Sequence, residues 1–206
     1  CNGILKMTIS KEKVILAREY ILEREPKKKF STFLCVSIND QKICLIDSEN
    51  NIVKSYPVSS SKYGVGNIND SFQTPCGLHI IEKKIGDDLP INTMLKGRKV
   101  LENGLTTDDL NDPKYKDFKK QHFENCDDII TSRILWLKGC EPGLNLGENI
   151  DTYNRYIYIH GTLHEDKIGK PASHGCIRMK NIEVIELYDL VKKGTFVNIL
   201  DDVESI

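Results

Sequence analysis

The spacing of hydrophobic residues changes near position 30, and this change divides a helical segment from a series of strands. Over residues 10–29 apolar side chains recur every three to four positions, Ser10 can cap the first turn, and Pro26 with the lysines that follow it ends the pattern. From residue 30 onward, apolar and polar residues alternate in short runs. We therefore predict an N-terminal helical segment over residues 1–29 and a domain built mainly of strands over residues 30–206.

Turn-forming residues separate the alternating runs, notably at 39–40 and 48–51. The predicted strands cover residues 30–38, 42–47, 52–58, 78–84, 156–159 and 196–200. The Ser-, Gly- and Asn-rich residues 59–70 predict a mobile loop, and residues 181–191 predict an amphipathic helix that closes at Gly194. Together these patterns predict a mainly β fold with helices, of the α+β class.

Residues 87–153 form a long polar stretch with few strand signals. A structureless loop of this length is rare in a compact domain. We therefore predict an insertion that carries one or two short helices or strands and forms one wall of a cleft. Trp136 lies in its more apolar part, residues 129–137, and could line the cleft or belong to the core.

The densest group of reactive side chains lies between residues 156 and 179, which hold three histidines and one cysteine. Residues 156–159 favour a strand that ends at His160, and residues 173–176 place Cys176 on a turn of small residues. A cysteine attacks as the thiolate, and an imidazole can take its proton and later return one to a leaving amine. We predict Cys176 as the nucleophile and His160 as the base, although His174 could be the base on spacing alone.

Neighbouring residues could shape the same pocket. The backbone N–H groups of His174, Gly175 and Cys176 could form an oxyanion hole, and glycine at 175 permits a sharp turn. Arg178 could bind a substrate carboxylate or hold the turn against the sheet. Ser173 is suited to a local hydrogen bond within the turn.

A zinc site is an alternative, because His160, His164, His174 and Cys176 are all potential ligands. Their spacing shows neither paired CxxC ligands nor an HExxH motif. We therefore predict no metal and no other cofactor, and we interpret His164 as a surface loop residue.

The motifs His160-Gly161-Thr162 and Ser173-His174-Gly175-Cys176-Ile177-Arg178 resemble the signature of the L,D-transpeptidase family, whose YkuD-type catalytic domain remodels bacterial peptidoglycan. The resemblance extends to Thr74-Pro75-Cys76-Gly77 and covers about residues 30–200. It implies a YkuD-type β-sandwich-like domain in which Cys176 is the nucleophile and His160 the base. Gly161 stands where some relatives carry serine, so the third catalytic group is left open, and its backbone carbonyl could orient the imidazole.

The resemblance also implies the reaction. Peptidoglycan stem peptides would acylate Cys176 with release of D-alanine, and an amine of a second stem would complete a cross-link. Water would instead give a carboxypeptidase, and a lysine of a wall-attached lipoprotein would give protein attachment. Two other classes fit less well: papain-like hydrolases place the cysteine before the histidine, and a non-catalytic wall-binding module would need neither residue.

Composition narrows the class of protein further. The chain has 206 residues, of which 39% are hydrophobic and 29% charged, and its net charge of −1 provides no general attraction to nucleic acid or anionic lipid. No apolar run approaches the roughly 20 residues of a membrane span. The seven cysteines do not have the spacing of a disulfide scaffold, and we interpret Cys35, Cys44 and Cys140 as buried apolar residues.

The resemblance implies a location in the bacterial cell envelope, periplasmic or exported. Cys1 could then be a lipid anchor, as in exported lipoproteins, or only the point at which the chain was cut.

Overall fold

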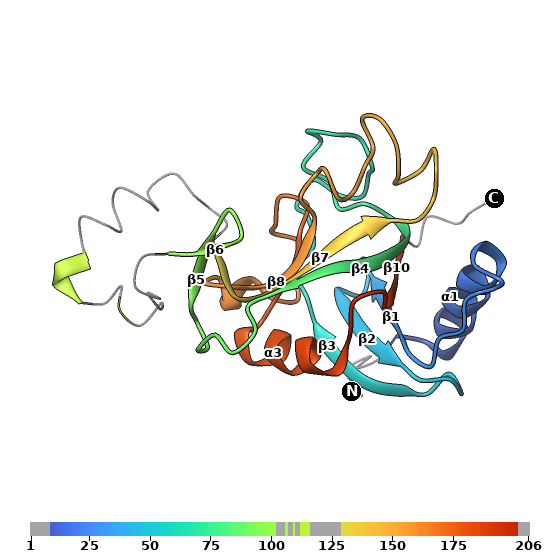
Figure 1. The fold of residues 1–206 in the computed structure, drawn as a ribbon, viewed down its shortest axis with the longest axis horizontal. Coiled ribbons are helices and arrows are strands. Elements are labelled where there is room, and N and C mark those ends of the chain that lie inside the picture. The colour runs from blue at the N-terminus through green and yellow to red at the C-terminus, as the bar shows by residue number, and fades with distance from the viewer. Residues whose placement is uncertain (1–8, 102–105, 107–108, 110–111, 116–128, 202–206) are drawn as a thin grey trace, which may run out of the picture.

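The structure is a computed structural model that describes residues 9–101, 106, 109, 112–115 and 129–201. Cys1, the candidate lipid anchor, lies outside these residues. Within the described part, ten strands form one curled sheet with two α-helices packed on it (Figure 1). The predicted fold class, mainly β with helices, is confirmed.

The elements have the following bounds: α1 (Lys11–Arg24), β1 (Phe33–Ser37), β2 (Lys42–Ile46), β3 (Ile52–Pro57), β4 (Gly77–Ile85), β5 (Met94–Lys96), β6 (Lys99–Val100), η3 (Pro113–Tyr115), β7 (Ile130–Gly139), β8 (Tyr158–Thr162), η4 (Glu165–Lys167), β9 (Ile177–Met179), α3 (Asn181–Leu190) and β10 (Phe196–Leu200).

The sheet joins both ends of the described chain. Its order is β3-β2-β1-β10-β4-β7-β5-β6, with β8 paired to β7 and β9 paired to β8. The predicted meander of β1, β2 and β3 is confirmed as two antiparallel pairs. Two pairs are parallel: β1 with β10, and β8 with β9. The second parallel pair carries the predicted catalytic motifs.

Each face of the sheet is covered by its own helix. Successive strand residues point to opposite faces, so Leu34 and Val36 of β1 join the core cluster that contains the apolar side chains of α3. Phe33 and Cys35 point the other way, into the cluster that contains α1. In Figure 1, α1 lies beside β1 and β10, whereas α3 lies on the other side of the sheet.

The N-terminal helix follows its sequence signals closely. The Ser10 hydroxyl accepts a hydrogen bond from the Lys13 amide at 3.3 Å, as an N-cap does, and the helix ends at Arg24, two residues before Pro26. The Tyr20 hydroxyl donates to Glu141 at 2.9 Å, and Arg24 forms an ion pair with the same carboxylate at 2.5 Å. The helix is therefore tied to the strand domain, although sequence separated the two at residue 29.

The stretch predicted as an insertion, residues 87–153, contains strands, as the prediction allowed, but residues 130–139 belong to the main sheet and are not inserted into it. These residues form β7, which pairs with β4, β5 and β8 and is buried on both faces. The sequence pattern did not indicate this strand, because it contains the polar residues Thr131, Ser132 and Arg133. The chain bulges at these residues, and Ser132 has a positive φ of 63°.

The prediction of a mobile loop over residues 59–70 also needs correction at its start. Ser59, Ser60 and Ser61 are buried, and Ser59 exchanges two backbone hydrogen bonds of 2.9 Å with Arg178. Serine hydroxyls can lie inside a domain when buried polar groups form hydrogen bonds with them. This stretch therefore supports the turn that holds Cys176.

Candidate active site

His160 and Cys176 lie on one face of two adjacent parallel strands. His160 is paired with Arg178 across β8 and β9, and Cys176 is two residues before Arg178, so alternation places Tyr158, His160, Cys176 and Arg178 on the same side. Ile159 and Ile177 point to the opposite face, into the core beneath α3. The predicted strand tip at His160 is wrong, because His160 is the central residue of β8.

The His160 ring is held in one tautomer. It is buried, and its Nδ1 lies 2.7 Å from the backbone carbonyl oxygen of Gly161. A carbonyl oxygen only accepts, so Nδ1 carries the proton and Nε2 is the basic nitrogen of the neutral imidazole. The backbone carbonyl of Gly161 thus orients the His160 ring.

Gly161 leaves no room for a side chain. A Cβ built there would lie 2.5 Å from the Thr131 carbonyl oxygen and 2.5 Å from Asn181 Oδ1. A serine at this position, as some relatives carry, would therefore clash with β7 and α3 in this chain. The packing explains why glycine stands here.

The Cys176 thiol lies between two backbone groups at the start of β8. Tyr158 N–H donates to Sγ at 3.4 Å, and Sγ donates to the Tyr156 carbonyl at 3.5 Å. An N–H donor favours the thiolate, whereas the carbonyl favours the protonated thiol. Tyr156 adopts a positive φ of 57°, which is a rare conformation for an aromatic residue, and β8 begins at Tyr158, two residues later than predicted.

Ser173 and Gly175 build the turn before Cys176. Ser173 is buried and donates its hydroxyl to the Cys176 carbonyl at 2.5 Å, and the same hydroxyl accepts from Gly175 N–H at 3.3 Å. Gly175 has φ 122°, and a Cβ there would lie 3.1 Å from Ile157 Cδ1. Ser173 is thus a turn residue, and the Gly175 amide, predicted as an oxyanion donor, points at this hydroxyl in the structure.

Arg178 is 1% exposed and donates to the Ala172 carbonyl at 3.3 Å. Its burial favours the second of the two predicted roles, in which it holds the turn against the sheet.

His174 lies on a different wall of the site from His160. Its ring centroid is 5.7 Å from that of Tyr63 and 6.1 Å from that of Phe72. It also lines a small cavity with Asp70 and Arg155. His174 therefore shapes the side of the site formed by residues 63–72.

Arg155 is a site residue that sequence reasoning missed. It donates to the Gly66 and Gln73 carbonyls at 3.0 and 2.7 Å, and so fixes this loop beside the thiol. Burial lowers the pKa of its guanidinium, and a thiolate at Cys176 would oppose that shift. No local pattern could reveal Arg155, because its partners lie more than 80 residues away in the chain.

An aromatic wall borders the thiol on the other side. Trp136 and Tyr153 stack with ring centroids 4.1 Å apart, and Tyr158 meets Trp136 edge-on at 5.5 Å. Cys176 packs against the same cluster of side chains. Trp136 is only 6% exposed, so it belongs to the core of this wall while its cluster borders the site.

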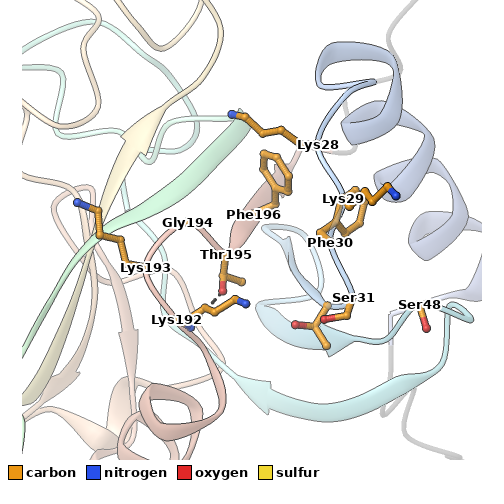
Figure 2. A pocket seen from close by; sticks show the side chains of 11 residues that line it. Lys28, Lys29, Phe30, Ser31, Ser48, Lys192, Lys193, Gly194, Thr195 and Phe196 are labelled. Carbon is orange, nitrogen blue, oxygen red and sulfur yellow. Dashed lines mark hydrogen bonds between the residues drawn. The ribbon is translucent and has the colours of Figure 1, made fainter.

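A larger cavity of about 570 Å³ lies elsewhere, where the segment before β1 meets the segment before β10. Figure 2 shows lysines of both segments around it, Lys28 and Lys29 from one and Lys192 and Lys193 from the other. Its lining includes no cysteine or histidine, so it offers neither a thiol nor an imidazole for catalysis.

Among the described residues, no three histidine, cysteine or acidic side chains come together as a metal site. Neither α-helix in this part of the chain has the length and apolar character needed to cross a membrane.

Comparison with known proteins identifies a family. Residues 31–199 match the family model described as the L,D-transpeptidase catalytic domain, YkuD. YqjB of Bacillus subtilis, which bears an inferred L,D-transpeptidase name, is 48% identical over 54 residues, 26% of this chain and 31% of that protein. YkuD of the same organism, also named by inference, is 56% identical over 41 residues, 20% of this chain and 25% of that protein.

These matched segments span about a third or less of the curated relatives. A solved L,D-transpeptidase from Mycobacterium smegmatis has 16% identity and a TM-score of 0.49, covering 83% of this chain and 59% of that one.

Proposed function

Because the chain belongs to the L,D-transpeptidase catalytic domain family, we propose that it forms peptidoglycan cross-links through an acyl-enzyme on Cys176. The observation that supports this proposal is the face of the β8–β9 pair that His160 shares with Cys176 by strand alternation, together with the His160 Nδ1–H fixed on the Gly161 carbonyl. This arrangement leaves Nε2 as the nitrogen that can take the thiol proton.

In the first half-reaction, the Cys176 sulfur attacks the carbonyl carbon that precedes the terminal D-alanine of a tetrapeptide stem. The thiol proton passes to His160 Nε2, a C–S bond forms, and the C–N bond to D-alanine breaks. His160 returns the proton to the departing nitrogen, so D-alanine leaves as a neutral amine. The amides of His174 and Cys176, which flank the engaged Gly175 amide, are the candidate oxyanion donors.

In the second half-reaction, an amine of a second stem attacks the thioester carbon. A new C–N bond forms and the C–S bond breaks, while His160 takes a proton from the amine and the thiol is regenerated. The amines of stem peptides are the acceptors we propose. Water in their place would give a carboxypeptidase, and a protein lysine would give wall attachment.

His160 is a better base than His174 on structural grounds. A hydrogen bond of 2.7 Å orients the ring of His160, whereas the ring of His174 packs on two aromatic rings of the loop. We therefore expect replacement of His160 by Asn to abolish acylation, and replacement of His174 by Asn to leave measurable acylation.

The test is incubation of the protein with a purified disaccharide tetrapeptide, followed by mass spectrometry of the products. We expect a dimer that lacks one D-alanine, formed by the wild type and not by Cys176→Ala. Cys140→Ala is the matched control, since burial raises the pKa of the Cys140 thiol to about 11 and leaves it unreactive. Tripeptide alone would show carboxypeptidase activity, and an unchanged tetrapeptide would refute catalysis and favour a wall-binding module.

The proposed substrate lies outside the cytoplasmic membrane, so we also propose that the protein acts in the cell envelope. Fractionation of cells that express the native gene, with detection by antibody, tests the location. Recovery in the cytoplasm alone would refute it.

A further inference from the structure

The hairpin of β5 and β6 ends in an arginine with an uncommon backbone conformation. Gly97 and Arg98 form its two-residue turn, with φ values of 53° and 71°. Turns with two positive φ values match the twist of paired strands, but their second position is usually glycine. A long charged side chain at such a position is uncommon and points to a constraint beyond the turn itself.

The Arg98 side chain turns back onto the aromatic wall. Its guanidinium carbon lies 4.9 Å from the ring centre of Trp136 and 4.9 Å from that of Tyr156. Its Nη1 donates to the Tyr158 hydroxyl at 3.2 Å. Three contacts thus hold the guanidinium of Arg98 in one place, although the residue lies on a short hairpin.

This guanidinium keeps most of its hydrogen-bonding capacity. One donor of five is used by Tyr158, and ring contacts engage the face of the group and not its edge. Among the described residues, no carboxylate forms an ion pair with Arg98; the charge partners nearest to it are tyrosines, whose interactions raise its pKa. An ordered guanidinium with unused edge donors is suited to bind a planar anion.

Tyr158 links this group to the reacting thiol. Its hydroxyl accepts from Arg98, and its backbone N–H donates to Cys176 Sγ at 3.4 Å. Arg98 therefore stands about one tyrosine side chain from the nucleophile, which is within reach of a group on the residue that is acylated or on its neighbour.

We propose that Arg98 binds a carboxylate of the donor stem peptide and so determines which stems are accepted. The inference rests on the proposed function. The carboxylate has two sources, the terminal D-alanine or the side chain of the residue that precedes it. Each source can be removed separately by conversion to a carboxamide.

The experiment measures peptide affinity by calorimetry in the Cys176→Ala protein, which cannot turn over. Three tetrapeptides are compared: one with both carboxylates free, one with the side-chain carboxyl amidated, and one with the terminal carboxyl amidated. Arg98→Gln is expected to weaken binding of the free peptide roughly tenfold, as loss of a charge-assisted pair does. Lys96→Gln, an exposed lysine of the same hairpin, is the control and should leave affinity unchanged.

The peptide whose affinity does not respond to Arg98→Gln identifies the carboxylate that Arg98 binds. Arg98→Lys should restore only part of the affinity, because lysine lacks the planar fork. Equal weakening for all three peptides, or no weakening, would overturn the proposal, and so would absence of binding by the parent protein. Turnover of the tetrapeptide by the wild type distinguishes a failure of this inference from a failure of the proposed function. If the wild type turns over the peptide but Arg98→Gln does not weaken binding, only the present inference is overturned. If binding depends on Arg98 but the wild type shows no turnover, only the proposed transpeptidation is overturned.

Discussion

Burial of His79 predicts that the fold loses stability in mildly acidic solution. The imidazole of β4 is fully buried, with Nδ1 2.9 Å from the Gly77 carbonyl and Nε2 3.1 Å from the Thr152 hydroxyl. Nδ1 must donate to the carbonyl, so Nε2 accepts from Thr152, and the neutral ring satisfies both partners. A second proton, on Nε2, would leave the Thr152 hydroxyl facing a donor. Burial also disfavours the charged ring and lowers the pKa of His79 from 6.5 to about 4.

The sign follows from proton binding by the two states. The unfolded chain takes a proton on His79 below pH 6.5, whereas the folded chain does not until about pH 4. Between these values the unfolded state binds more protons, so its stability relative to the folded state increases as pH falls. The free energy of unfolding should therefore decrease by about 2 kcal/mol at pH 5 and about 3 kcal/mol at pH 4, at about 1.4 kcal/mol per pKa unit.

The assay is urea denaturation from pH 7 to pH 4, followed by fluorescence of the single tryptophan. The comparison is between wild type and His79→Gln, which does not titrate, with His164→Gln as the control for a histidine on a loop. His79→Gln should lower stability at pH 7 and flatten the pH dependence, whereas the control should keep the wild-type slope. An unchanged slope in His79→Gln would refute the argument from burial.

Two further predictions concern the packing around the base. Asn181→Ala should lower the free energy of unfolding by about 3 kcal/mol in urea melts. It removes three hydrogen bonds, of 2.6, 2.7 and 2.9 Å, to buried groups of Thr131, Ser132 and Thr162, and each is worth about 1 kcal/mol. An unchanged midpoint would show that these groups find other partners. Gly161→Ser and Gly161→Ala should both cost about 1–3 kcal/mol by overpacking against β7 and reduce the rate of thiol acylation, and a stable, active serine variant would contradict the steric account.

Sequence patterns correctly predicted the helix and the turns whose formation depends on neighbouring residues in the chain. The N-cap at Ser10, the apolar spacing of α1 and the turns of the β1–β3 meander are all readable along the chain. β7 was not readable as a strand, because its burial on both faces removes alternation and its bulge buries polar residues.

The candidate site shows the same limit. Cys176, His160 and the turn at Ser173 came from a compact motif, and strand alternation puts Cys176 and His160 on one side of β8 and β9. Arg155 directly precedes this motif but bonds to the distant Gly66 and Gln73, and Arg98 reaches the site only through Tyr158. Sequence order cannot reveal which arginines converge on a site when their partners are backbone carbonyls and aromatic rings.

The parallel pairing of β1 with β10 has a consequence for the order of folding. Phe33 is the register partner of Phe196, so the hairpin of β1 and β2 leaves the ribosome with one edge unpaired, and that edge waits for almost the whole described chain to follow. An open edge with buried side chains on both faces is prone to pair with the wrong strand. Long-range strand pairing also slows folding. In a chain of this topology the first hairpin therefore stays open to incorrect pairing during synthesis until the last strand is available.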